Sequence, residues 1–567
     1  MTALPVRDIG FAQWEDPHAW METMEGSKWN TVIKEENKYV SDYIKQPKVK
    51  RRIASFTEFA EKGAEESAIP YVFRCGPISI SPLSSMFLFW RFITKPYKSF
   101  YSTDVFADSR GAWTLNEIGH GALVYQLEFW EVDKNIPTWS IKPVGQTIAI
   151  IENRCYYTGV FNKLWFNELW SCDAETGKDA ILHYKELNPE IVLNIVRYPN
   201  NKVYMTRENA QDLTYYKITQ GKLIEEKEPE HTWHGLTVKR SNGKSTLYKS
   251  NEKVVSIPAG RIVIDPWASF LNSDSAHIIV EQPHASFRCY RWQNNNLKMV
   301  NRPIDSGLKI IEEKIDGIRY IIVCKKEVEK PEHVLITGYG AYGLATNTEY
   351  AKKRWNPLLE SNWAIGYTFL PGGGDHTTAF AKMGRLSGRQ KTIDAFLKCV
   401  RHIKTTYKLR PENIVIYGRS AGGLLVGGSL NEVPDGSLFG GIFTEVAYLD
   451  ELRTTTNPDL PLTQLEYNEF GNPSRSIEEF LSVGLLSPAN SAMSLKTPNV
   501  FIYAKTATND TQVYAYESVK WIRRLRTKGK PKLLKINVGI GHFTPPNMAV
   551  KTSALDCAIL DTLVMQD

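Results

Sequence analysis

The sequence predicts a two-part molecule: a doubly wound, mostly parallel α/β sheet domain near the C-terminus and an all-β domain before it. From about 311 to 567, apolar strands alternate with helical stretches such as 391–408, a texture typical of βαβ units. From about 61 to 310, short alternating or aromatic runs recur between turn residues, which indicates many short antiparallel strands. A helical segment, residues 1–60, precedes both parts.

The first 60 residues are rich in Glu, Lys and Trp. Their apolar residues recur at mixed helical spacing, which favours helices over strands: Trp29, Val32, Ile33, Tyr39, Val40 and Ile44.

The next region, 61–310, contains short apolar runs such as 86–90, 123–129, 147–151 and 277–280. A propeller blade takes about 40–50 residues, so this length accommodates five or six ordinary blades or seven short ones. A sandwich or a barrel fits the composition equally well. The strand pattern therefore predicts an all-β domain and leaves its closure open.

The third region carries the most informative motif, the G-x-S-x-G sequence around Ser420. An apolar strand, 413–416, leads into it and a small-residue helix start follows. This context is that of a nucleophile elbow, in which Gly418 and Gly422 supply space and the serine hydroxyl projects at a helix N-terminus. The alternative is a tight strand-to-helix turn with an incidental serine.

A serine needs a base and an acid that orients the base, in the order Ser, Asp, His for this kind of elbow. Asp510 and His542 follow two further predicted strands, 499–503 and 533–538, so both lie at the edge where catalytic loops gather. Asp510 alternatively caps the helix predicted from 513 to 526, and His542 alternatively is a surface loop residue.

An oxyanion hole requires donors beside this nucleophile. The N–H of Ala421 is one candidate, and the hydroxyl of Tyr339, in the glycine-rich turn after strand 334–337, is another. A structural turn in which the tyrosine rings only pack is the alternative, and spacing does not separate the two.

Composition restricts the function classes. The 567-residue chain is 42% hydrophobic and 23% charged, with a net charge of +7 and Lys/Arg clusters only in short pieces, so we expect no nucleic-acid surface. Seven scattered cysteines, no apolar leader and no run of about 18 apolar residues favour a cytoplasmic protein that does not span a membrane. His231 and His234 lack partners at metal-ligand spacing, so neither a metal nor a cofactor is expected.

Five motifs occur in one order: 338–343 (Gly-Tyr-Gly-Ala-Tyr-Gly), 372–375 (Gly-Gly-Gly-Asp), 418–423 (Gly-Arg-Ser-Ala-Gly-Gly), 469–473 (Glu-Phe-Gly-Asn-Pro) and 509–513 (Asn-Asp-Thr-Gln-Val). Together with Asp-Pro-His-Ala-Trp-Met-Glu at 16–22, they make the chain resemble the prolyl oligopeptidase family, and most its oligopeptidase B branch.

The resemblance implies an α/β-hydrolase peptidase domain, residues 311–567, capped by a β-propeller, residues 61–310, with residues 1–60 packing on the peptidase domain. It assigns Ser420 as nucleophile, His542 as base, Asp510 as orienting acid and Tyr339 as oxyanion donor. It also implies short peptides as substrates. The assembly is expected to be a monomer or a dimer.

The chain departs from the resemblance at the specificity segment. Oligopeptidase B relatives carry a Glu-x-Glu pair that favours Lys or Arg on the acyl side of the cut, whereas this chain has Glu466 and Asn468. One carboxylate fewer predicts a retained but blunted basic preference. Glu466 and Glu469 are alternatively ordinary solvated carboxylates, and for Glu469 this is the favoured interpretation.

Two other functions remain open at this stage. The same triad serves an esterase or thioesterase with little peptidase activity, because fold and triad do not fix the leaving group. A non-catalytic protein that binds partners through its propeller is the second alternative, against which the complete Ser420, Asp510 and His542 set counts.

Overall fold

The fold is taken from a computed structural model of the chain. The structure describes all residues except 1–4, 67–72, 76–77, 83–89, 95–97, 103, 108–109, 119–124, 132–133, 135, 162–164, 189–190, 199–201, 209–212, 228–234, 242, 265–274, 461, 493–497, 527–528 and 566–567. The predicted run 86–90 lies almost entirely, and His231 and His234 lie entirely, outside the described residues.

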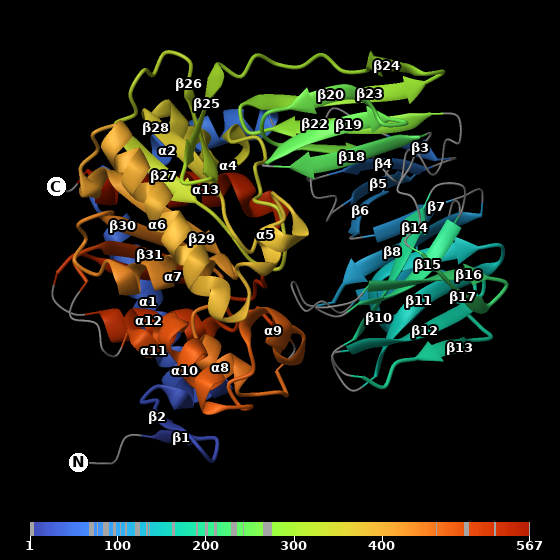
Figure 1. The fold of residues 1–567 in the computed structure, drawn as a ribbon, viewed down its shortest axis with the longest axis horizontal. Helices are drawn as coiled ribbons and strands as arrows, with labels where there is room; N and C mark the ends of the chain where they lie inside the picture. Colours follow the sequence, from blue (N-terminus) through green and yellow to red (C-terminus); the bar gives the residue numbers. More distant parts are fainter. Residues whose placement is uncertain are drawn as a thin grey trace.

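An eight-stranded sheet forms the centre of the α/β part (Figure 1), in the order β25-β26-β28-β27-β29-β30-β31-β32. Strands β25 and β26 are antiparallel to their neighbours, and β28 to β32 pair in parallel. This order confirms the predicted α/β domain. The strands are β25 (Leu308–Ile315), β26 (Ile318–Lys325), β27 (His333–Thr337), β28 (Trp363–Phe369), β29 (Ile414–Arg419), β30 (Gly441–Glu445), β31 (Phe501–Ala507) and β32 (Lys532–Asn537).

Helices cover both faces of this sheet. Because successive side chains of a strand point to opposite faces, a single strand contributes to the buried cluster on each side. In β27, for example, Val334 and Ile336 join one buried cluster and Leu335 joins the other. The first cluster includes residues of α1 (Gly26–Ile44), α6 (Arg389–Thr406), α7 (Gly422–Glu432) and α12 (Ala515–Leu525). The second includes residues of α2 (Pro47–Glu66), α4 (Lys352–Glu360) and α13 (Ala549–Val564).

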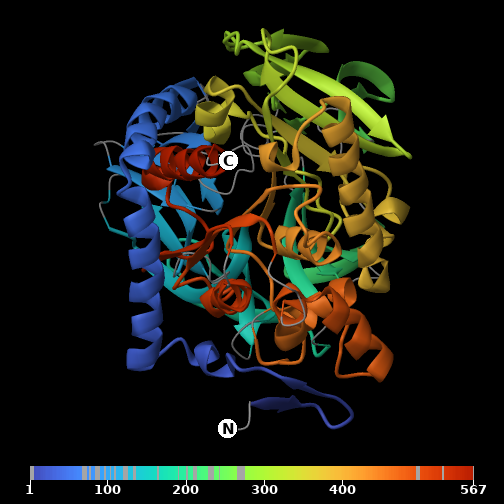
Figure 2. The ribbon, with the colours of Figure 1, turned by 90° about the vertical axis from the view of Figure 1, so that its left-hand side faces the viewer.

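The N-terminal helices run along one side of the α/β domain, beside α13 (Figure 2). Asn37 of α1 covers the edge strand β32: its side-chain amide donates to the carbonyl oxygen of Ile536, and its carboxamide oxygen accepts the Ile536 N–H, each at 2.9 Å. A hairpin of β1 (Val6–Asp8) and β2 (Gln13–Glu15) and a short 3₁₀ helix, η1 (Ala19–Thr23), precede α1.

In the sequence, strands β3 to β24 lie between helix α2 and strand β25. They form antiparallel sheets, which are drawn on the right of Figure 1. Two of them contain β3 (Phe73–Cys75), β4 (Ile78–Pro82), β5 (Trp90–Thr94) and β6 (Lys98–Ser102), and β7 (Asp104–Ala107), β8 (Gly111–Glu117), β9 (Tyr125–Glu131), β10 (Trp139–Ile151), β11 (Arg154–Phe161), β12 (Trp165–Asp173) and β13 (Ile181–Lys185).

Three further sheets follow along the chain. They contain β14 (Val192–Tyr198), β15 (Lys202–Glu208), β16 (Leu213–Thr219) and β17 (Lys222–Glu226); β18 (Leu236–Ser241), β19 (Lys244–Lys249) and β20 (Glu252–Ile257); and β21 (Arg261–Ile264), β22 (Ala276–Gln282), β23 (Ala285–Gln293) and β24 (Asn296–Met299). The all-β texture is thus confirmed, while closure into a propeller and the domain boundaries stay predictions.

The β-rich part contacts the α/β part through backbone hydrogen bonds. The N–H of Gly243 donates to the carbonyl oxygen of Asp375 at 2.8 Å, and the N–H of Ala351 donates to that of Pro283 at 2.9 Å. Within the described part of the chain, no helix has the length and apolar character needed to cross a membrane. Six cysteines of that part are free, buried thiols.

Candidate active site

Ser420 lies on a sharp turn between β29 and α7, as the elbow motif predicts. Its φ is 54°, a left-handed value that is costly for any residue other than glycine and that marks a turn held by its surroundings. Its N–H donates to the carbonyl oxygen of Glu445 at 3.0 Å, and its own carbonyl accepts the N–H of Tyr448 at 2.9 Å. The end of β30 and the loop that follows it therefore hold the serine backbone.

The glycines of the motif differ in their roles. A Cβ on Gly418 would lie 2.1 Å from the carbonyl oxygen of Gly422, and one on Gly423 would lie 2.6 Å from the Cβ of Ala447. A Cβ on Gly422 would have no neighbour closer than 3.6 Å. The expectation that Gly422 supplies space is therefore wrong, and Gly423, which faces the loop after β30, takes that part beside Gly418.

Asp510 and His542 meet at the carboxyl edge of the sheet, after β31 and β32. Both are buried, and the imidazole Nδ1 lies 2.7 Å from the Asp510 Oδ2. The Asp510 Oδ1 accepts the backbone N–H groups of Gln512 and Val513, each at 2.9 Å. Helix α12 begins at Ala515 with Tyr514 as its N-cap, so Asp510 is not the cap of that helix.

The loop that carries His542 is fastened to the elbow by Arg419, the residue before Ser420. One guanidinium nitrogen of Arg419 donates to the carbonyl oxygen of His542 at 2.5 Å. The same guanidinium lies 5.0 Å from the ring centre of Phe543. Sequence reasoning missed this role, although an arginine inside the G-x-S-x-G motif was a visible signal.

Tyr339 lies in the turn after β27, and its ring packs against the apolar cluster that includes Ala421 and Leu424. Burial raises the pKa of the Tyr339 phenol well above its ordinary range, so the hydroxyl keeps its proton and is able to donate. Ala421 is buried at the N-cap of α7. The structure therefore places both expected oxyanion donors at the turn that carries Ser420.

An apolar cluster surrounds these groups. It contains residues from four catalytic-edge loops and from α9 (Thr463–Phe470), which carries the predicted specificity segment. The ring of Phe470 lies 5.3 Å from that of Tyr342 and 5.4 Å from that of Tyr448. The members are Ala341, Ala421, Leu424, Tyr448, Phe470 and Val513, with Tyr339 and Tyr342 packed against them.

The two glutamates of α9 are buried. Glu466 accepts the Tyr342 hydroxyl at 2.8 Å, and burial raises its pKa to about 8. Glu469 accepts the Tyr342 N–H at 2.8 Å and pairs with Arg385 at 3.0 Å. The favoured interpretation of Glu469 as a solvated carboxylate is therefore wrong, because tertiary contacts bury it. Asn468 lies half-buried on the same helix.

Three further charged residues near α9 were not predicted. Burial raises the pKa of Glu451 to about 7 and that of Glu517 to about 8. Glu517 accepts the N–H groups of Leu449 and Asp450, while Arg389 lies 4.0 Å from Glu451 and 3.9 Å from the ring centre of Phe470. The signal for Glu451 was its place shortly after a buried strand.

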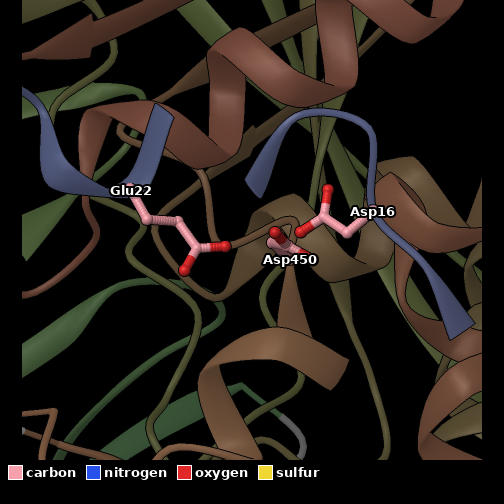
Figure 3. A group of neighbouring side chains, drawn as sticks. All are labelled: Asp16, Glu22 and Asp450. Carbon is pink, nitrogen blue, oxygen red and sulfur yellow. The ribbon is translucent and has the colours of Figure 1, made fainter. Parts of the chain in front are cut away.

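A separate cluster of three carboxylates, Asp16, Glu22 and Asp450, has spacing compatible with a metal ion (Figure 3). The ammonium group of Lys520 instead donates to all three, at 2.8, 2.6 and 2.9 Å. Arg524 also donates to Asp16 at 2.8 Å, and Arg453 to Glu22 at 2.6 Å. These cations already neutralise the carboxylates, so the donor set does not fit a further cation.

Comparisons with known proteins agree with the motifs. Residues 356–556 match the prolyl oligopeptidase family. Protease 2 of Moraxella lacunata is 31% identical over 216 residues, which are 38% of this chain and 30% of that protein. Dipeptidyl aminopeptidase BI of Pseudoxanthomonas mexicana is 27% identical over 325 residues, 54% of this chain and 43% of that protein. The matches thus span less than half the length of these relatives.

Solved structures resemble the chain over nearly its whole length. Oligopeptidase B from Leishmania major superposes with a TM-score of 0.79 and 15% identity, covering 98% of this chain and 94% of that one. Oligopeptidase B from Trypanosoma brucei, with covalently bound antipain, gives 0.77 and 16%, covering 98% and 95%. At these identities the likeness establishes the fold. The resemblance inferred from the motifs is confirmed.

Proposed function

The chain carries a prolyl oligopeptidase family segment at residues 356–556, and from this premise we propose that it is a serine oligopeptidase that hydrolyses short peptides. The observation that carries the proposal is the 2.7 Å contact between His542 and Asp510 beside an elbow serine. Because Nδ1 of His542 is engaged by Asp510, Nε2 is the nitrogen left to take the proton of Ser420.

The proposed reaction is acyl transfer to water. The Ser420 Oγ attacks the peptide carbonyl carbon while His542 takes its proton, and the carbonyl oxygen becomes an oxyanion held by the Tyr339 hydroxyl and the Ala421 N–H. His542 then protonates the leaving amine, the C–N bond breaks and an acyl-enzyme remains. Water, deprotonated by His542, attacks the acyl carbon. The bond between that carbon and the Ser420 Oγ then breaks, His542 returns the proton to Oγ, and the acid leaves.

The acyl-side preference is proposed to be a blunted one for Lys or Arg. Glu466 supports it as a buried carboxyl group, whereas Asn468 brings no second charge. With a pKa of about 8, Glu466 is largely protonated at neutral pH, which weakens its attraction for a cation. A bidentate arginine contact loses most from this arrangement.

Three organisational features belong to the same proposal. Residues 1–60, 61–310 and 311–567 form the helical, β-propeller and peptidase parts, and the closed propeller limits access to short peptides. Free, buried cysteines in the described part of the chain are compatible with a reducing, cytoplasmic location.

Covalent labelling by a fluorophosphonate, read by intact mass, tests the proposal. We expect one adduct on the wild type and none on Ser420→Ala, whereas Ser437→Ala, which removes an exposed hydroxyl bonded to Asp435, labels like the wild type. An unlabelled, folded wild type would contradict an activated serine. Parallel turnover of ester and peptide substrates then separates a peptidase from an esterase or thioesterase.

A further inference from the structure

Tyr342 joins the turn that carries Tyr339 to helix α9 through three contacts. Its N–H donates to Glu469 and its hydroxyl donates to Glu466, both at 2.8 Å. Its ring lies 5.3 Å from that of Phe470, with the ring planes at 78°. All three partners belong to α9, so one side chain and one amide fix this turn against that helix.

The backbone at Tyr342 depends on these contacts. Its φ is 56°, in the left-handed region that a bulky side chain occupies only at an energetic cost. Two glycines of the same turn, Gly340 and Gly343, also have left-handed φ values, of 65° and 64°. Glycines adopt such values freely, so the turn has little stiffness of its own and relies on outside contacts.

Tyr339, the proposed oxyanion donor, sits three residues earlier in the same turn. The rings of Tyr339 and Tyr342 are 6.3 Å apart, and the Tyr339 ring would lie 3.8 Å from a Cβ on Gly422, two residues after Ser420. A donor acts on an oxyanion only within a narrow range of positions, about 2.7–3.1 Å. Any movement of the turn away from α9 would therefore displace this donor.

We propose that Tyr342 is a positioning residue: its hydrogen bonds to Glu466 and Glu469 hold the oxyanion turn so that the Tyr339 hydroxyl faces the reacting carbonyl. This inference rests on the proposed peptidase function. It gives the α9 glutamates a second task, because the helix that contributes to substrate preference also fixes the catalytic donor.

Tyr342→Phe tests this role by removing the hydroxyl and keeping the ring. With a neutral peptide substrate, and kcat expressed per fluorophosphonate-titrated site, we expect kcat to fall about tenfold while KM changes little. The decisive measurement repeats the change in a Tyr339→Phe background. If Tyr342 acts by placing the Tyr339 hydroxyl, its loss there lowers kcat less than about twofold, because coupled residues are not additive.

Tyr350→Phe is the matched control, since Tyr350 is a fully buried tyrosine whose hydroxyl donates to Glu66 at 3.1 Å, away from the site. It should lose similar stability and leave kcat unchanged. If Tyr342→Phe fails to fold, Glu466→Leu removes the same hydrogen bond by deleting its acceptor. This variant should lower kcat on neutral substrates by a similar factor.

The outcomes distinguish a failure of the positioning role from a failure of the peptidase proposal. Full fluorophosphonate labelling with an unchanged kcat in Tyr342→Phe overturns the positioning role and leaves the peptidase function intact. An equal loss of kcat in the Tyr339→Phe background also overturns it. Absence of labelling in the wild type overturns the peptidase proposal and this inference with it.

Discussion

Replacing Asp510 by asparagine exchanges one oxygen for an NH₂ group in a site with little freedom to adapt. Oδ1 of Asp510 accepts two backbone N–H groups, from Gln512 and Val513, and Oδ2 accepts from His542. The amide oxygen of asparagine must stay where the two N–H donors point. Its NH₂ group is thereby directed at Nδ1 of His542.

This arrangement inverts the imidazole tautomer. A donor facing Nδ1 requires that nitrogen to be an acceptor, which leaves the proton on Nε2, where it is unable to receive the proton of Ser420. In a Ser-His-Asp triad this change costs about 10⁴ in kcat, or about 5.4 kcal/mol at 1.36 kcal/mol per decade. Because Asp510 is 1% exposed, water has little room to replace the lost acceptor.

The assay is single-substrate turnover on a fluorogenic peptide, normalised to folded protein, with fluorophosphonate labelling rates beside it. Asp435→Asn is the matched control, since Asp435 is an exposed carboxylate that accepts the N–H and hydroxyl of Ser437. We expect the control to behave as the wild type. A loss of less than about tenfold in Asp510→Asn would refute the assignment of Asp510 as the orienting acid.

Three other changes give separate expectations. Tyr339→Phe should lower kcat by about 10²–10³ by removing an oxyanion donor; an unchanged rate would exclude that role. Glu466→Gln should reduce cleavage after Arg more than after neutral residues. In the wild type the Arg-to-neutral ratio of kcat/KM should rise about tenfold from pH 7 to pH 9, since a carboxyl of pKa about 8 becomes charged as the pH rises, and the variant should lose this rise. Lys520→Met should lower the free energy of unfolding by about 3–5 kcal/mol in urea titrations, because two buried carboxylates and the partly buried Glu22 lose their shared cation. Lys38→Met, which breaks an exposed pair with Asp42, should cost less than about 1 kcal/mol, and equal losses would contradict the argument.

The sequence was sufficient to predict the parts of the site that local patterns encode. Ser420, Asp510 and His542 each follow a buried strand, and parallel strands deliver their C-terminal loops to one edge, so chain position translates into proximity. The strand expected at 533–538 is β32, Lys532–Asn537, and the helix expected at 513–526 is α12, Ala515–Leu525.

Local sequence patterns were not sufficient to predict the tertiary contacts of α9. A glutamate in a polar stretch reads as solvated, yet Glu469 is buried because a tyrosine amide and an arginine from distant segments converge on it. The helix itself has little apolar periodicity to reveal its buried side. The role of Gly422 was misjudged for the same reason, since the loop after β30 that faces Gly423 becomes known only in three dimensions.

The pairing of the two ends of the chain has a consequence for biosynthesis. Asn37 binds the backbone of Ile536, 499 residues later, and α2 packs on α13. Helix α2 also packs on α4, about 300 residues later. At a translation rate of about 5–20 residues per second, the apolar face of α2 waits roughly 15–60 s for α4 to be synthesised and roughly 25–100 s for α13. Val49 and Phe56 of the nascent chain lack these partners for that time, which makes it a natural client for a chaperone that shields hydrophobic segments near the exit tunnel.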